Sequence, residues 1–336
     1  MSDSQKIAGE AAIIQGFLEP LSRSWPGAFG LLDDCAVVAP APGHELVVKT
    51  DPVRQGVHFF ADDAPADIAW KAVAVNVSDL AAKAARPVAY MLALSLPDAP
   101  TRTWMAEFAE GLRAAQEAFG CVLIGGDTDQ MDGPLSAAVT VFGEVPSGRM
   151  VRRATPAVGD ALLVSGTLGD AALGLRLRQG EAIDGLRDED RAAALARYLR
   201  PRPRLGLRVA LRTWAHAAMD VSDGLGKDLG RMCHAGGLAA EVELARLPLS
   251  AALIAGTSDD MALRKRLVSS GDDYEVLCAV APSDVDQFVA VCAAAGETVT
   301  NIGRFIAANG AAPTPILLDE SGNTTPWGQA GYDHFS

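Results

Sequence analysis

Short apolar runs that lead towards an aspartate recur along this chain. Residues 46–50 precede Asp51, and the apolar run 121–124 lies just before Asp127. Apolar runs of this length are typical of buried strands. A strand that ends in a carboxylate brings it to one end of the sheet, so we expect these aspartates at a common end.

The spacing of apolar residues in the first 145 residues predicts helices and strands in alternation. Helices are expected at 4–19, 64–84 and 101–119, and strands at 35–38, 46–50, 88–96, 121–124 and 135–145. This alternation predicts an α/β domain, while the strand spacing also permits antiparallel pairing, as in an α+β fold.

The segment 145–160 is rich in turn residues and arginines and predicts a domain boundary. Beyond it we expect strands at 161–165, 238–242 and 274–280. Helices are expected after the turn 166–170, at 188–200, at 204–216, after the MDVSDGL motif up to about 235, and at 282–295. The remaining tail reads as loop-rich. The sequence therefore predicts two domains, residues 1–148 and 149–336, without an internal repeat of fixed period.

Composition agrees with an ordered protein of two domains. Of the 336 residues, 49% are hydrophobic and 21% are charged, and this length allows two separate cores. The formal net charge of −13 disfavours nucleic acid and anionic membranes as partners, because no basic patch is present to neutralise phosphates. A polyanionic substrate such as ATP would have to arrive with metal ions.

The cysteine pattern and the N-terminus favour a cytoplasmic location. The five cysteines are odd in number and widely spaced, without a CxxC or Cys/His metal pattern. No signal-peptide pattern is present, and no apolar stretch approaches the length of a membrane span. A reducing compartment is the simplest expectation.

Seven aspartates in five motifs are the main candidates for chemistry. They are Asp33 and Asp34 in LLDDCAVV, Asp51 in VVKTD, Asp79 in NVSDLAA, Asp127 in LIGGDT, and Asp220 and Asp223 in MDVSDGL. Converging carboxylates must be protonated, paired or bound to metal, because unpaired charge is costly to bury. Mg²⁺ binds such oxygens together with substrate phosphates. The pattern therefore indicates phosphate chemistry without a Walker-type lysine.

The MDVSDGL motif has two interpretations. If a helix begins here, Asp220 and Asp223 lie on one face of its first turn. Ser222 is then a candidate N-cap, and the free N–H groups at that end attract anions. The alternative is that Ser222 or Asp223 merely caps the helix.

Other motifs also combine a chemical and a structural interpretation. Gly126 would let backbone approach a phosphate beside Asp127, although Gly-Gly-Asp is also an ordinary turn. Asp79 falls close to the apolar face of its helix and is therefore more informative than an aspartate in a loop. A lone histidine such as His58 is more often structural than catalytic. The boundary arginines, including Arg153, could hold phosphate or simply be solvated.

Taken in order, these motifs resemble the thiamine-monophosphate kinase family. They are LLDDCAVV, VVKTDPVRQGVHF, AWKAVAVNVSDLAAKAARP, LIGGDT, RRATPAVGD, VSGTLGDAALGL, MDVSDGLGKDL, SSGDDYEVL and a terminal GYDHF. The resemblance extends from about Gly30 to Phe335. The family belongs to the ATP-binding superfamily that includes aminoimidazole ribonucleotide synthetase.

The resemblance implies a two-domain PurM-like fold. Its N-terminal domain would bind ATP and Mg²⁺ and form a homodimer, and its C-terminal α/β domain would complete the active site. The implied reaction is direct transfer of the ATP γ-phosphoryl to thiamine monophosphate, which gives thiamine diphosphate and ADP with the help of several Mg²⁺ ions. Such a reaction needs positioning and charge neutralisation more than a protein nucleophile. A requirement for K⁺ is left open.

The resemblance also implies a role for individual residues. The implied Mg²⁺ ligands are Asp34, Thr50, Asp51, Asp79, Asp127, Asp220 and Asp223. Among them, Asp51, Asp127 and Asp223 are the expected catalytic residues. The implied ATP contacts are Gly126, Asp127, Arg153 and Ser222, and the implied thiamine monophosphate contacts are His58, Asp272 and Tyr332.

Three residues depart from the family pattern. Leu32 stands in place of a glycine, Lys49 in place of a small hydroxyl residue, and Asp129 adds a carboxylate near the proposed triphosphate. These departures leave the number of bound metal ions and the ATP affinity open.

Two other functions compete with the kinase. A sister enzyme of the superfamily would need a reactive cysteine in a Gly-rich N-terminal segment or a cysteine tail at its C-terminus. A silent nucleotide- or metal-binding regulator would show the loss of a key aspartate. The sequence has none of these features.

Overall fold

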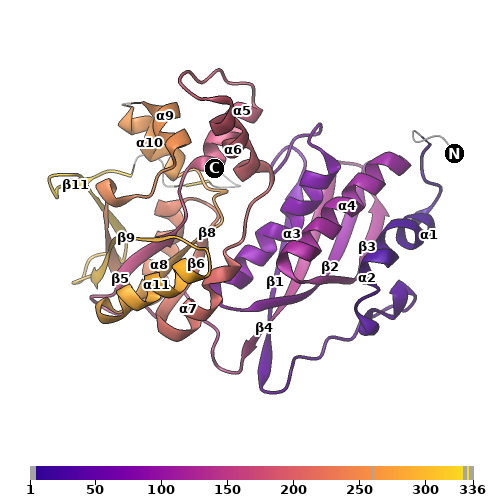
Figure 1. Cartoon of the computed structure of the whole chain (residues 1–336), viewed down its shortest axis with the longest axis horizontal. Coiled ribbons are helices and arrows are strands. Elements are labelled where there is room, and N and C mark those ends of the chain that lie inside the picture. The colour runs from indigo at the N-terminus through magenta and orange to yellow at the C-terminus, as the bar shows by residue number, and fades with distance from the viewer. Residues whose placement is uncertain (1–4, 259, 328–330, 333–336) are drawn as a thin grey trace. The chain divides into compact units, whose positions relative to one another are not determined.

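The computed structural model describes residues 5–258, 260–327 and 331–332. The chain folds into two compact units (Figure 1). Unit 1 comprises Met1–Leu80 and Ala85–Gly148, and unit 2 comprises Ala81–Ala84 and Arg149–Ser336. Within the described part of the chain, every helix is too short or too polar to cross a membrane.

Unit 1 is built on a mixed four-stranded sheet. In spatial order its strands are β1 (His44–Arg54), β4 (Ser136–Pro146), β2 (Arg86–Leu96) and β3 (Val122–Gln130). Strand β4 is antiparallel to both of its neighbours, while β2 and β3 are parallel. The sheet thus contains both kinds of pairing that the strand spacing permitted.

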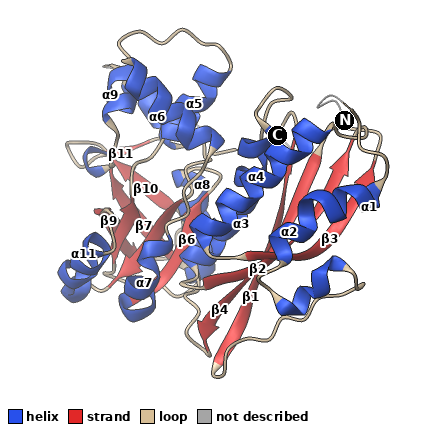
Figure 2. Cartoon of the chain, turned by 45° about the vertical axis from the view of Figure 1, so that its right-hand side comes forward, coloured by secondary structure: helices blue, strands red, loops and turns tan. Residues whose placement is uncertain are grey.

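Two long helices, α3 (Pro65–Ala82) and α4 (Arg102–Phe119), cover one face of this sheet (Figure 2). The Thr101 side chain caps α4 by accepting a hydrogen bond from the Trp104 N–H, and Gly120 ends it in a left-handed conformation. The helices approach closely at Gly111, where a Cβ atom would lie 2.2 Å from the carbonyl oxygen of Ala66. Both helices occupy the ranges that the apolar spacing predicted.

The opposite face of the sheet is only partly covered. The segment around η2 (Pro26–Leu31) packs there, with Ala28 buried against Ala89 and Ile124. Beyond this segment, Val48 is 56% exposed and Met91 is 36% exposed. An apolar surface is therefore left open on the sheet of a single chain.

Two predictions for the N-terminal part of unit 1 need correction. Residues 35–38 are not a strand: the Val37 N–H bonds to Gly27, and its carbonyl accepts from Trp25, but no strand ladder forms. The first helix starts at residue 10 instead of 4. It consists of α1 (Glu10–Ile13), the π-helical η1 (Ile14–Leu18) and α2 (Glu19–Ser22).

Unit 2 contains a seven-stranded sheet with the order β11-β10-β7-β9-β5-β8-β6. Its strands are β5 (Ala161–Ser165), β6 (Ala215–Val221), β7 (Leu238–Glu243), β8 (Glu275–Val280), β9 (Val299–Ala307), β10 (Pro315–Leu318) and β11 (Thr324–Thr325). Its α-helices are α5 (Asp170–Arg178), α6 (Asp188–Leu199), α7 (Arg208–Trp214), α8 (Leu225–Gly236), α9 (Ala251–Thr257), α10 (Met261–Val268) and α11 (Val285–Ala294).

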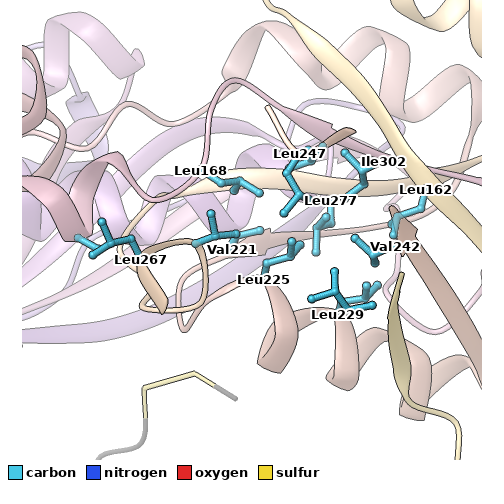
Figure 3. Close-up of a cluster of buried hydrophobic side chains, with 14 of the residues drawn as sticks. Leu162, Leu168, Val221, Leu225, Leu229, Val242, Leu247, Leu267, Leu277 and Ile302 are labelled. Carbon is cyan, nitrogen blue, oxygen red and sulfur yellow. The ribbon is translucent and has the colours of Figure 1, made fainter. Parts of the chain in front are cut away.

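The central strands of unit 2 are buried on both faces. On one face Leu162 and Leu277 join a core with Leu229 of α8 (Figure 3). On the other face Leu163 packs in a second core with Phe288 of α11. Strands buried on both faces read as continuous apolar runs, and for this reason β5 and β8 were predictable.

Several elements of unit 2 differ from the prediction. The helix expected at 204–216 ends at Trp214, after the 3₁₀ turn η3 (Leu205–Leu207), and the following seven residues form β6. The tail is not loop-rich, since it forms β9 and β10, and α9 and α10 were also missed. In β9 a glycine interrupts the apolar pattern: at Gly303 a Cβ atom would lie 1.9 Å from the Glu241 carbonyl oxygen.

A buried ionic network holds the first residue of β8 in place. The fully buried Glu275 carboxylate accepts hydrogen bonds from Ser165 (2.5 Å), Arg197 (2.6 Å) and Arg204 (2.6 Å). Burial lowers the pKa of Arg204, but the opposing attraction of Glu275 and Glu297 is larger in sum and raises that pKa above its usual range. The ion pair is therefore retained in the folded state.

Replacing Glu275 by glutamine is expected to lower the free energy of unfolding by about 3 kcal/mol, because two guanidinium groups lose their buried counter-charge. Urea unfolding followed by circular dichroism measures this loss. The matched control is Glu243→Gln, which breaks an exposed pair with Arg246 and should cost less than about 1 kcal/mol. Equal losses in both variants would contradict a stabilising role of the network.

Candidate active site

In unit 2 the MDVSDGL motif spans a strand, a turn and the start of a helix. Asp220 lies on β6 and is buried, while Ser222 and Asp223 form the turn that follows. Helix α8 begins only at Leu225, and its N-cap is Gly224 without a side-chain cap. Both interpretations of this motif are therefore wrong: the two aspartates do not share the first turn of a helix, and neither Ser222 nor Asp223 caps α8.

The turn is held by an aspartate that the sequence analysis did not identify. One carboxylate oxygen of the buried Asp228 accepts hydrogen bonds from the N–H groups of Ser222 (2.9 Å), Asp223 (2.8 Å) and Gly224 (3.1 Å). The other oxygen pairs with Arg231 at 2.7 Å. Burial raises the pKa of Asp228 to about 6, although the N–H donors and Arg231 act in the opposite direction. Asp228 thus fixes the backbone from which Asp223 projects.

The same turn interlocks with the SSGDDYEVL motif. At Gly224 a Cβ atom would lie 2.1 Å from the Ser269 carbonyl oxygen, and at Gly271 it would lie 2.4 Å from the Ser222 carbonyl oxygen. The Asp272 N–H donates to that same Ser222 oxygen at 2.8 Å. Asp272 itself has a φ of 63°, which is unusual for an aspartate. Two glycines therefore allow the two motifs to touch, and Asp272 is placed beside Ser222.

Tyr332 is also brought to this turn. Its N–H donates to the Asp223 carbonyl oxygen at 3.0 Å, and its own carbonyl oxygen accepts from Lys227. The Asp223 carboxylate faces Arg231 at 2.6 Å and Lys227 at 3.3 Å. Unit 2 therefore gathers five of the predicted site residues in one place: Asp220, Ser222, Asp223, Asp272 and Tyr332. The rest of the GYDHF motif, residues 333–335, lies outside the described residues.

In unit 1 the VVKTD and NVSDLAA motifs meet. Asp51 lies in the interior of β1 and Asp79 lies on α3, and Lys49 bridges them with contacts of 2.8 Å and 3.0 Å. The Thr50 hydroxyl points to the other side of the strand, where it donates to Val139 and accepts from Thr140. Burial lowers the pKa of Lys49, but Asp79 and Asp51 together raise it above its usual range.

Asp127 and Gly126 lie within β3, next to β2. Gly126 has a φ of 149°, and a Cβ atom there would lie 1.8 Å from the Leu92 carbonyl oxygen, so only glycine fits. The Asp127 side chain is exposed and accepts a hydrogen bond from the Thr128 N–H at 2.9 Å. Strands β1 and β3 continue beyond Asp51 and Asp127. The prediction that these aspartates end their strands is therefore wrong.

The remaining predicted residues lie on other segments of the chain. Asp34 is exposed in the loop after η2. The His58 ring accepts a hydrogen bond from the Arg54 N–H through Nδ1, which places the proton of a neutral ring on Nε2. The buried Lys71 holds the same segment by donating to the His58 carbonyl oxygen. Arg153, in unit 2, is half-buried in the boundary segment.

The oxygen donors suit Mg²⁺ chemically, but they are not arranged as a finished site. Among the residues that the structure describes, no group of three or more His, Cys, Asp or Glu side chains is placed to hold a metal ion. The carboxylates of Asp51, Asp79 and Asp223 instead contact lysine or arginine. Hard oxygen ligands and partial exposure fit a metal that arrives with a phosphate substrate.

Two family models match most of the chain. The AIR synthase related protein N-terminal domain matches residues 32–145, and the C-terminal domain of the same family matches residues 157–314. The two α/β units agree with this match and confirm the expected PurM-like fold. The class of protein is thus an AIR synthase related protein.

Individual relatives show to which family within this class the chain belongs. The thiamine-monophosphate kinase of Caulobacter vibrioides is 42% identical over 300 residues, which is 88% of this chain and 84% of the relative. The thiamine-monophosphate kinase structure from Stenotrophomonas maltophilia K279a is 38% identical, with a TM-score of 0.82 over 96% of this chain and 99% of that one. The structure of AaThiL complexed with AMPPCP and TMP is 28% identical, with a TM-score of 0.76 over 92% and 97%. The chain belongs to the thiamine-monophosphate kinase family.

Proposed function

We propose that this protein transfers the γ-phosphoryl group of ATP to thiamine monophosphate, in an Mg²⁺-dependent reaction that yields thiamine diphosphate and ADP. The observation that carries the proposal is the likeness, over nearly the whole chain, to a structure complexed with AMPPCP and TMP. AMPPCP is an analogue of ATP whose terminal phosphate is not readily transferred. Direct phosphoryl transfer requires the nucleotide and TMP to be bound together.

Aspartates of both units supply the groups that phosphoryl transfer needs. Asp127, Asp220 and Asp223 are proposed as metal ligands, together with Asp34 and Thr50. Bound Mg²⁺ would neutralise charge on the transferring phosphate. The motifs of Asp51 and Asp79 assign them the same role as metal ligands, although Lys49 contacts both of them in this structure.

Residues that contact substrates are assigned by motif and supported by local structure. Gly126, Arg153 and Ser222 are proposed for ATP, and the Leu92 backbone of the neighbouring strand excludes any side chain at Gly126. Asp272 and Tyr332 are proposed for thiamine monophosphate, and both are hydrogen-bonded to the turn that carries Asp223. A contribution of K⁺ is testable by exchanging K⁺ for Na⁺ in the assay.

The open face of the unit 1 sheet supports a homodimer as part of the proposal. Val48 and Met91 are exposed apolar residues on a sheet whose other face is covered by helices. Burying such a face against a second copy would remove it from water. The five cysteines are free thiols and four of them are buried, which supports a reducing cytoplasm as the location.

The direct test is product analysis of the purified protein with ATP, Mg²⁺ and thiamine monophosphate, resolved by chromatography, with EDTA as control. We expect equal amounts of thiamine diphosphate and ADP, and neither in EDTA. ATP consumption without thiamine diphosphate would show that the acceptor is wrong. No consumption at all would favour a silent nucleotide-binding protein.

Replacing His58 by alanine is expected to raise the KM for thiamine monophosphate about tenfold, equivalent to ~1.4 kcal/mol, and to leave the KM for ATP nearly unchanged. The variant would lack the Nε2 hydrogen-bond donor that the imidazole ring offers to the acceptor substrate. Steady-state kinetics with each substrate varied in turn measures both constants. His44→Ala, at the start of β1, is the control. An equal rise of both constants would place His58 outside the acceptor site.

A further inference from the structure

The contact between Lys49, Asp51 and Asp79 joins two elements of unit 1. The lysine nitrogen lies 2.8 Å from an Asp51 oxygen and 3.0 Å from an Asp79 oxygen. The side chains of Lys49, Asp51 and Asp79 are 32%, 48% and 19% exposed, respectively. The three groups therefore form a half-buried cluster with one positive and two negative charges, in which the lysine supplies the cation.

The backbone of β1 sets this position. Lys49 and Asp51 are two residues apart on a strand, so their side chains leave the same face of the sheet. Across the sheet they pair with Val141 and Val139 of β4, which are buried. That face is the one against which α3 brings Asp79. Strand geometry thus places the lysine on the face of the sheet where both carboxylates lie.

A divalent ion could not join both carboxylates while the lysine stays there. Mg²⁺ needs ligand oxygens at about 2.0–2.1 Å in an octahedron. An ammonium at hydrogen-bond distance from the same two carboxylates fills that space and repels a second cation at close range. One ammonium and one bridging ion are therefore alternatives.

We propose that Lys49 is the resident cation of the Asp51–Asp79 pair and takes the place of a bridging divalent ion, so that this protein binds one metal ion fewer than its aspartate motifs suggest. The inference rests on the proposed function only in one respect, namely that the aspartate motifs are taken to be metal-binding motifs. It makes Lys49 a positioning residue that keeps Asp51 and Asp79 together without metal.

The test is Mn²⁺ binding to the full chain without nucleotide, measured by the electron paramagnetic resonance signal of free Mn²⁺. We expect Lys49→Ser to bind one Mn²⁺ ion more than the unaltered protein. Adding Asp79→Asn to Lys49→Ser should remove that extra ion, whereas Asp79→Asn alone should leave the number unchanged. Lys6→Ser, which removes a lysine paired with Asp98, is the matched control and should change nothing.

Two results would overturn the proposal. One is an equal number of ions in Lys49→Ser and the unaltered protein. The other is the loss of one ion in Asp79→Asn alone, because the pair would then hold metal despite Lys49. Thermal unfolding gives an independent readout: Lys49→Ser should melt lower in EDTA and regain its stability with Mn²⁺, while the unaltered protein should show a smaller shift. An identical metal-dependent shift in both proteins would count against the proposal.

Failure of this inference can be told from failure of the proposed function. Product analysis reports on the reaction, and Mn²⁺ counting without substrates reports on the pair. An active kinase whose Lys49→Ser variant gains no ion would refute the inference alone. An inactive protein whose Lys49→Ser variant gains an ion would refute the proposed function alone.

Discussion

Replacing Asp127 by asparagine is expected to lower the rate of thiamine diphosphate formation at least about a thousandfold, or ~4 kcal/mol in the barrier, without loss of stability. The side chain is exposed on β3 and accepts one hydrogen bond from the neighbouring Thr128 N–H. An asparagine oxygen can accept the same bond, so the fold has little to lose. A neutral amide is a much poorer Mg²⁺ ligand than a carboxylate. Measurement of kcat at saturating substrates, beside a thermal unfolding curve, separates the two effects.

The matched control is Asp132→Asn, which removes an exposed carboxylate from the loop after the same strand. It should keep both the rate and the stability. If Asp127→Asn retained a near-normal rate, Asp127 would not be a metal ligand, and the metal set proposed for unit 1 would be wrong. If the rate and the stability fell together, the loss would reflect the fold instead of the chemistry.

The parts of the fold that the sequence predicted well are those whose signal is local. Helices α3 and α4 are long and periodic, and strands β5 and β8 are continuous apolar runs because both of their faces are buried. Residues 35–38 are also apolar, but they pack on the sheet of unit 1 without joining it. Strand β9 was missed because its glycine, required by a close neighbouring backbone, breaks the pattern.

The same distinction applies to the candidate site. The position of Asp79 near an apolar helix face was visible in the sequence, and its neighbours in the chain, Val77 and Leu80, are fully buried in the structure. The importance of Asp228 was not visible, because its hydrogen-bond donors are backbone N–H groups. Only the folded turn brings them to one oxygen. The Lys49 contact likewise depends on packing between β1 and α3.

Replacing Asp228 by alanine is expected to lower the free energy of unfolding by about 3 kcal/mol and to reduce kcat strongly. Three buried or half-buried N–H groups would lose their common acceptor, and Arg231 would lose one of its two carboxylate partners. The turn that carries Ser222 and Asp223 would then be free to open. Urea unfolding measures the stability, and hydrogen exchange measures the protection of the amides at 222–224, which should fall more than that of the central strands.

Two further variants decide whether the effect is specific to this turn. Asp228→Asn keeps an oxygen that can accept from the same N–H groups, so it should regain more than half of the lost stability. Asp286→Ala removes an exposed aspartate from the first turn of α11 and should cost less than about 1 kcal/mol, because such surface positions gain only a weak helix-dipole interaction. If Asp228→Ala left the protection of 222–224 unchanged while the rate fell, Asp228 would act on the reaction directly, and its assignment as the residue that shapes the turn would be wrong.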